Sequence, residues 1–222
     1  MIKSMTLTLL LSFLANIDLQ SSNEITLDTY EAKSQEYIRN TQPLSIEIKG
    51  WLNSTVSFIK KEDFILELGS AFGQDANYLE SLGYKVERTD AAKSFITILK
   101  NQGHEATLLN LLTDELGKDY GLIFANSVLH HFTPQELEAI LNKINKSLKP
   151  SGILSFCVKQ GTGEKLSKEV LGAPRYFCYW MPTDLKKILT ENGFELLNLT
   201  VLPENNSDRI CVIARKVNRG TI

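Results

Sequence analysis

Short apolar runs alternate with amphipathic stretches along most of the chain. The apolar runs, which predict strands, lie at residues 64–68, 84–89, 106–109, 120–126 and 152–158. Apolar residues at helical spacing lie between them, at 74–82, 91–101 and 134–148, and Thr133 and Pro134 mark the start of the last of these helices. Strands that alternate with helices of this length join through right-handed crossovers. The pattern predicts an α/β fold, with a doubly wound, mainly parallel sheet and helices on both faces.

The regions on either side of this core extend the pattern. Apolar spacing predicts two helices ahead of the first strand, at 29–40 and 43–60, as a lid or flank. A glycine-rich, charged stretch with an aromatic cluster, at 160–182, interrupts the alternation as an insertion over a pocket would. A seven-stranded sheet is completed by a helix and two strands joined by a hairpin, at 183–192, 194–202 and 209–215. We expect one domain over 29–222 and an N-terminal extension over 1–28.

The extension contains an apolar run, Met5–Ala15, that follows Lys3. The run has the length of a signal-peptide core and is too short to span a bilayer, so we expect no stable membrane insertion. No A-x-A-like cleavage site follows it. A packed N-terminal helix, or residues added by a misplaced start ahead of Met5, are the alternatives to a signal. Either alternative leaves a cytoplasmic protein, which is our expectation.

Composition narrows the choice of function class. The 222 residues are 43% hydrophobic and 23% charged, as in ordinary globular proteins, and the formal net charge is -2. This charge creates no broad field for a polyanion, so nucleic-acid binding has little support, although a local basic patch is compatible with it. The three cysteines include no CxxC pair, which predicts reduced, buried thiols and neither a zinc site nor a disulfide framework.

The first strand ends in a turn of small residues, Ile65-Leu-Glu-Leu-Gly-Ser-Ala-Phe-Gly73. Glycine lets the backbone take positive φ and lets a ligand approach it closely, as a nucleoside at a strand-to-helix turn requires. The dinucleotide fingerprint fails here because Ala71 and Gln74 occupy its second and third glycine positions. A P-loop fails as well, because no G-K-[ST] follows Gly69.

With Glu67, Gly69, Ala71 and Gly73, the turn resembles the first motif of the class I S-adenosylmethionine-dependent methyltransferases, with alanine in place of the middle glycine. The resemblance implies a Rossmann-like methyltransferase fold with S-adenosylmethionine as cofactor. Its methionine part would lie against this turn, Ser70 included. Asp90 ends the second strand near the spacing at which such folds bind ribose hydroxyls, with Ala91 beside it. An alternative and compatible role for Asp90 is to cap the following helix.

Further positions match the same family. The resemblance places Asn110 and Leu111, after the third strand, on the adenine, where the family commonly carries an aspartate; an ordinary turn asparagine is the alternative. The end of the fourth strand would contact the methionine part through three residues, Ala125, Asn126 and Ser127. Tyr30 and Tyr37 share one face of the lid helix and match a tyrosine pattern that covers the cofactor, unless they only pack this helix on the sheet.

His130 and His131 follow the fourth strand on the side expected for the methyl acceptor. Adjacent side chains diverge and rarely bind one ion together, so we predict no metal site. Imidazole titrates near neutrality, which makes either histidine a candidate catalytic base. The alternative is one packed and one hydrogen-bonded histidine.

The aromatic cluster of the insertion supplies candidates for acceptor binding: Arg175, Tyr176, Tyr179 and Trp180. Arg175 can bind an anionic group bidentately, whereas local packing of the aromatic side chains is the alternative. The sequence thus predicts in-line methyl transfer from S-adenosylmethionine to a small-molecule acceptor. An RNA or protein methyltransferase, or a non-catalytic protein that binds S-adenosylmethionine, are the competing hypotheses.

Overall fold

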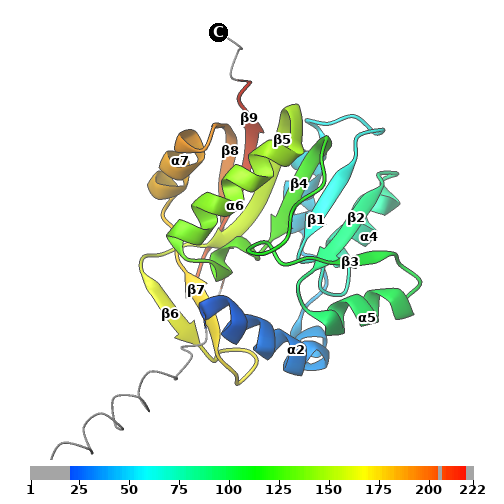
Figure 1. Cartoon of the computed structure of the whole chain (residues 1–222), viewed down its shortest axis with the longest axis vertical. Helices are drawn as coiled ribbons and strands as arrows, with labels where there is room; N and C mark the ends of the chain where they lie inside the picture. Colours follow the sequence, from blue (N-terminus) through cyan, green and yellow to red (C-terminus); the bar gives the residue numbers. More distant parts are fainter. Residues whose placement is uncertain (1–20, 205–206, 219–222) are drawn as a thin grey trace, which may run out of the picture.

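The computed structural model describes residues 21–204 and 207–218, and its body is one seven-stranded sheet in the order β3-β2-β1-β4-β5-β9-β8. The pairs among β1 to β5 are parallel, whereas β9 runs antiparallel to both β5 and β8. The predicted doubly wound fold is therefore confirmed (Figure 1). The strands of this sheet are β1 (Ile65–Leu68), β2 (Val86–Asp90), β3 (Ala106–Leu108), β4 (Tyr120–Asn126), β5 (Leu148–Lys159), β8 (Phe194–Leu202) and β9 (Arg209–Lys216).

Helices cover both faces of the sheet. One apolar cluster joins the sheet to α3 and α4, and another joins it to α6 and α7. Successive residues of β4 enter the two clusters in turn, Leu122 and Phe124 on one face, Ile123 and Ala125 on the other, because side chains of a strand alternate. The helices are α2 (Ser22–Asn40), α3 (Ile46–Val56), α4 (Gln74–Ser81), α5 (Lys93–Asn101), the 3₁₀ helix η2 (Leu129–His131), α6 (Pro134–Ser147) and α7 (Pro182–Glu191).

The first described helix, α2, begins earlier than the sequence predicts. The Ser21 side chain accepts the Glu24 backbone N–H, and the Glu24 carboxylate accepts the Ser21 N–H, which forms a capping box. The boundary expected between residues 28 and 29 therefore falls inside this helix. The apolar run Met5–Ala15 lies outside the described residues. Within residues 21–204 and 207–218, no helix is long and apolar enough to cross a membrane.

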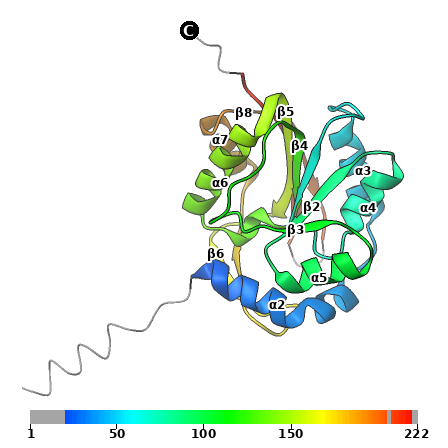
Figure 2. The ribbon, with the colours of Figure 1, turned by 45° about the vertical axis from the view of Figure 1, so that its right-hand side comes forward.

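The insertion after β5 forms a small antiparallel sheet of its own, from β6 (Glu164–Ser167) and β7 (Arg175–Cys178). Figures 1 and 2 show α2 lying across the carboxyl ends of the parallel strands, between this hairpin and α5. The residues of α2 that are buried are polar, namely Asn23, Thr26, Thr29 and Ser34. The helix predicted as a lid thus covers the strand ends with a hydrogen-bonding face.

The expectation of reduced thiols is wrong for two of the three cysteines. Cys157 and Cys211 form a disulfide between β5 and β9, and Cys178 is free and buried. The two bonded residues are direct cross-strand partners with Cα atoms 4.1 Å apart. They are separated by 54 residues in sequence, so only the antiparallel pairing of the two strands brings them together.

The disulfide predicts how many thiols react. Titration of the protein in denaturant without reductant should detect one thiol per chain, that of Cys178. Adding reductant should lower the free energy of unfolding by about 2–4 kcal/mol, because the link restrains the unfolded chain. The matched control is the double variant Cys157→Ala/Cys211→Ala, whose urea transition should not respond to reductant. Three titratable thiols in the untreated protein would contradict the cross-strand link.

Candidate functional site

The turn after β1 requires a backbone conformation that few side chains tolerate. Gly69 has φ +71°, and a Cβ added to it would lie 2.5 Å from Cγ2 of Val128. Ala71 takes the same left-handed conformation, with φ 47°, at the position where the family motif has glycine. Gly73 has φ +86° and begins α4 as its N-cap. The turn therefore requires glycine at position 69, because the Val128 side chain fills the space that a Cβ would need.

Asp90 holds this turn in place from the end of β2. Its Oδ2 accepts the Ala71 N–H at 2.9 Å, and its Oδ1 accepts the Ala92 N–H at 2.9 Å. Burial raises the pKa of Asp90 to about 6. Each carboxylate oxygen has a second lone pair. The expectation that Asp90 caps the following helix is wrong, because the N-cap of α5 is Ala92 and has no side-chain cap hydrogen bond. Asp90 can still accept hydrogen bonds from a ligand's hydroxyl groups.

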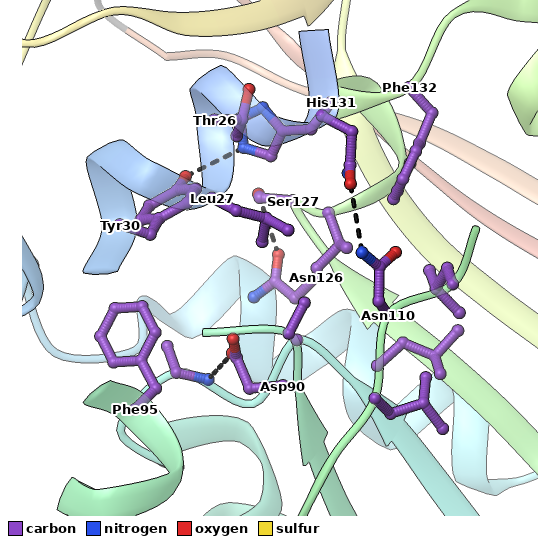
Figure 3. A pocket seen from close by; sticks show the side chains of 18 of the residues that line it. Thr26, Leu27, Tyr30, Asp90, Phe95, Asn110, Asn126, Ser127, His131 and Phe132 are labelled. Atoms are coloured by element: carbon purple, nitrogen blue, oxygen red, sulfur yellow. Dashed lines mark hydrogen bonds between the residues drawn. The ribbon is translucent and has the colours of Figure 1, made fainter. Parts of the chain in front are cut away.

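A pocket lies between these strand ends and α2. It contains about 700 Å³ of empty space, open solvent at its mouth included. Figure 3 shows Leu27 and Tyr30 of α2 facing Asp90, Asn110 and Asn126 at the strand ends. The pocket gathers ten of the residues predicted to bind the cofactor, namely Tyr30, Tyr37, Gly69, Ala71, Asp90, Ala91, Asn110, Leu111, Asn126 and Ser127.

The remaining predicted cofactor residues support the pocket from behind or beside it. Ser70 lines a neighbouring hollow, and its Oγ accepts the Thr89 N–H. Ala125 is fully buried in the sheet, and Glu67 is 2% exposed beneath the turn. Burial, followed by the charge of Asp75, raises the pKa of Glu67 to about 8. Burial therefore favours the neutral form of the Glu67 carboxyl group.

Asn110 is oriented by two hydrogen bonds. Its amide oxygen accepts the Leu112 N–H at 3.0 Å, and its amide nitrogen donates to the Asn23 side chain of α2 at 3.3 Å. A carbonyl oxygen has two lone pairs, so a ligand's amino group can still donate to Asn110. The contact between Asn110 and the adenine stays a prediction. Asn23, which the sequence did not single out, orients Asn110 for it.

Tyr30, His131 and Arg175 form a hydrogen-bonded chain that fastens α2 to the insertion. His131 Nδ1 lies 2.7 Å from the Tyr176 carbonyl oxygen, which can only accept, so Nδ1 carries the proton. Nε2 therefore accepts the Tyr30 hydroxyl at 2.9 Å, and the same hydroxyl oxygen accepts an N–H of Arg175 at 3.1 Å. Burial lowers the pKa of His131 to about 3, so its ring is neutral.

Two further hydrogen bonds secure the same contact between α2 and the insertion. The Thr29 hydroxyl donates to the Pro174 carbonyl oxygen at 2.6 Å, and Thr26 Oγ1 accepts the Tyr176 N–H at 3.0 Å. Arg175 itself is 6% exposed and lies over the rings of Tyr30 and Phe177. The arginine predicted to bind an anionic acceptor is thus occupied in the contact between lid and hairpin.

His130 has a different environment. It is 3% exposed, its ring lies against His131 and Phe177, and its Nδ1 is buried without a hydrogen-bond partner among the described residues. Burial lowers its pKa well below the usual value, and the neighbouring His131 and the charges of Lys159 and Arg209 act in the same direction. Its ring is therefore neutral, with one nitrogen still free.

The other residues predicted to bind the acceptor are dispersed. The Tyr176 hydroxyl donates to Glu164, and Tyr179 lies beneath the ammonium group of Lys165. Trp180 lines a separate hollow between α6 and α7. The structure therefore does not bring these three side chains together at the pocket, and their roles stay predictions.

Several residues at the site were not singled out in the sequence, among them Asn23, Thr26, Asp75, Phe95, Phe177 and Arg209. Those on α2 lie on the helical face of Tyr30 and Tyr37, so their spacing carried a signal. Asp75 directly follows the glycine turn in the first turn of α4, which was also a usable signal. Arg209 begins β9, and no motif connects it to the pocket.

Comparisons with known proteins agree with this geometry. Residues 66–154 match the family model described as a methyltransferase domain. A Synechocystis protein described as an uncharacterized methyltransferase is 27% identical over 139 residues, which cover 60% of this chain and 60% of that protein.

Solved structures share the fold. The Burkholderia thailandensis 1,6-didemethyltoxoflavin-N1-methyltransferase, with S-adenosylhomocysteine bound, superposes with a TM-score of 0.72 at 15% identity, covering 87% of this chain and 88% of that one. Magnesium protoporphyrin IX methyltransferase of Synechocystis, with S-adenosylmethionine bound, gives 0.69 at 13% identity, covering 90% and 99%. These structures show the fold alone, whereas the family-model match over residues 66–154 and the glycine turn support membership of the class I S-adenosylmethionine-dependent methyltransferase superfamily.

Proposed function

We propose that the protein transfers the methyl group of S-adenosylmethionine to a small-molecule acceptor. The observation that carries this proposal is the pocket itself, where Asp90 and Asn110 face the polar lid helix across a largely apolar space. These groups match the ribose hydroxyls and the adenine amino group of the cofactor. Structurally similar enzymes act on small molecules such as 1,6-didemethyltoxoflavin and magnesium protoporphyrin IX, which supports an acceptor of this size.

The bound cofactor would supply an electrophilic methyl group, which leaves its sulfur by in-line displacement. The protein's part is to position the acceptor and exclude water. The lid α2 supplies the exclusion, and the chain Arg175–Tyr30–His131 keeps it against the hairpin. His131 is a positioning residue in this scheme, because both of its ring nitrogens are engaged. His130 keeps the role of candidate base that the sequence suggests, but its Nδ1 is buried, its lowered pKa makes it a weak base, and it is not among the residues that line the pocket.

Radiolabelled S-adenosylmethionine tests the activity. Incubated with the protein and cell extract, it should label the small-molecule fraction, and the label should depend on the protein. Label in the protein or nucleic-acid fraction would mean that the acceptor is a protein or a nucleic acid and not a small molecule. Binding of S-adenosylhomocysteine without any labelled product would favour the non-catalytic alternative.

We also propose that the protein works in the cytoplasm, where its cofactor is a metabolite. The Cys157–Cys211 disulfide weighs against this compartment, because disulfides concentrate in oxidising environments. The proposal is tested by alkylating free thiols in intact cells of the source organism and counting the modified cysteines of this protein. Two further alkylated cysteines in addition to Cys178 would support a reducing compartment, and their absence would contradict it.

Asp90→Asn tests the ribose assignment with less disturbance than alanine, because the amide oxygen can still accept one backbone N–H. Removing the charge should weaken binding of S-adenosylhomocysteine by about 1.5–3 kcal/mol, as measured by calorimetry. Affinity of the unmodified protein should rise as pH rises through about 6, because the ionised carboxylate is the better acceptor. Asp184→Asn, at an exposed position of α7, is the control. Unchanged affinity in folded Asp90→Asn would remove Asp90 from the ribose site.

The two histidines should behave differently. His131→Ala should weaken binding of S-adenosylhomocysteine about tenfold, because Tyr30 and the lid lose their partner, and Tyr30→Phe should have the same effect. The loss in the double variant should be smaller than the sum of the two single losses, because both single variants remove the hydrogen bond between Tyr30 and His131. His130→Ala should leave this affinity unchanged and lower turnover of an identified acceptor by about 10²–10⁴. Additive losses for Tyr30 and His131 would contradict the proposed chain.

A further inference from the structure

Lys159 is the last residue of β5 and lies where the carboxyl ends of the parallel strands meet the insertion. The strand continues beyond Cys157, the partner of Asn126 at the end of β4. On its other side, Lys159 is the direct cross-strand partner of Arg209, the first residue of β9. β5 also contacts η2, the turn that carries both histidines. Lys159, which is half-buried, thus belongs to the surroundings of the pocket.

The ring of Phe177, on β7, joins Lys159 to the two histidines. The Lys159 ammonium nitrogen lies 5.3 Å from the centroid of this ring, and the Arg175 guanidinium carbon lies 5.1 Å from it. The rings of His130 and His131 lie against the same ring, with centroids 5.1 Å and 4.8 Å from its centroid. Because His131 also lines the pocket, this group of side chains adjoins the pocket.

Lys159 differs from the neighbouring cations because no acidic side chain pairs with it. Arg209 pairs with Glu204 at 2.6 Å, and Lys165 pairs with Glu169 at 3.6 Å. In the part of the chain that the structure describes, no carboxylate lies within ion-pair distance of Lys159, so its three N–H donors stay available. Like charges directly opposite each other on two strands destabilise a sheet, and Lys159 faces Arg209 in this way. An anion bound at Lys159 would relieve this repulsion.

The charges and the free hydrogen-bond donor near Lys159 also favour an anion. Burial lowers the pKa of Lys159, and Arg175 and Arg209 act in the same direction, whereas Glu204 and Glu169 act in the opposite one. Arg175 is 6% exposed, and its Nε is buried without a hydrogen-bond partner among the described residues. A buried donor that lacks an acceptor is costly. An oxyanion carries the opposite charge and accepts hydrogen bonds, so it meets both requirements.

We propose that Lys159 binds an oxyanion of the methyl acceptor, a carboxylate or a phosphate, and so selects anionic acceptors over neutral ones. This inference rests on the proposed function, because it takes the neighbouring pocket to hold the cofactor. Lys159 determines specificity in this scheme, and Arg175 adds positive charge while it fastens the lid. Lys159 lies outside residues 66–154, the segment that matches the family model. The choice of acceptor thus depends on the end of β5 and on the insertion that follows it.

Separation of the acceptor by charge tests the proposal before the acceptor is identified. Small molecules from cell extract are separated on an anion exchanger at neutral pH, and each fraction is incubated with the full chain and radiolabelled S-adenosylmethionine. The acceptor should be in the retained, anionic fraction. Phosphatase treatment of this fraction should abolish labelling of a phosphate acceptor and leave labelling of a carboxylate acceptor intact. An acceptor found only in the unretained fraction would overturn the proposal.

Variants then assign the selection to Lys159. At limiting amounts of the retained fraction, Lys159→Met should lower labelling about 10- to 100-fold, as expected when a charged hydrogen-bond donor is lost. Lys159→Arg should recover part of the loss, and a higher concentration of the fraction should restore labelling by Lys159→Met, because the loss is one of acceptor binding. Calorimetry should show the same affinity for S-adenosylhomocysteine in all variants. Lys165→Met is the matched control, because Lys165 lies on the same hairpin with its ammonium nitrogen 5.5 Å from the centroid of the Tyr179 ring.

The pattern of outcomes separates this inference from the proposed function. If the unmodified protein binds no S-adenosylhomocysteine, or labels no small-molecule fraction, the proposed function fails. If it labels the retained fraction and Lys159→Met labels that fraction equally well, the assignment to Lys159 is wrong and the proposed methyl transfer stands. If Lys159→Met loses affinity for S-adenosylhomocysteine together with labelling, Lys159 supports the cofactor site and does not select the acceptor. That result would also overturn the inference.

Discussion

The Asp90 carboxylate connects two parts of the site that come from different elements, the turn after β1 and the segment before α5. It binds the Ala71 N–H of the turn after β1 and the Ala92 N–H ahead of α5, so it fixes two neighbouring strand ends to each other. The turn needs this support because Ala71 has a left-handed backbone, a conformation unfavourable for any residue with a Cβ. The same carboxylate faces the pocket. One buried charge thus both stabilises the turn and offers itself to a ligand.

The lid is attached in a different way from the rest of the molecule. Helices α3, α4, α6 and α7 bury apolar side chains against the sheet, whereas the buried residues of α2 are polar. When α2 moves away, water replaces the hydrogen bonds that it loses, so each bond contributes only about 0.5–1.5 kcal/mol to holding the helix in place. A contact made of such bonds can therefore open at lower cost than an apolar one. A ligand enclosed beneath α2 needs this reversibility to enter and leave.

Burial also decides the protonation of the site. His130 and His131 are neutral because the ionised ring is poorly solvated there, and Glu67, Asp75 and Asp90 have raised pKa values for the same reason. The adenosyl cofactor carries a sulfonium and an ammonium group. The acidic groups can ionise when a cationic ligand binds, and the histidines beside them carry no charge that would repel it. This combination suits a cationic ligand.

The sequence by itself determined the sheet, the glycine turn and the residues at the ends of β1, β2, β3 and β4, because strand and helix periodicities and turn residues are local properties. It placed β4 and β8 at their observed bounds and the start of α6 at its cap. Tertiary structure alone decided three matters: the Cys157–Cys211 disulfide, the meeting of Arg209 with Asp75 across Asn126, and the engagement of Arg175 by Tyr30. Each joins residues far apart in the chain through strand pairing or lid docking, and no local pattern carries that information.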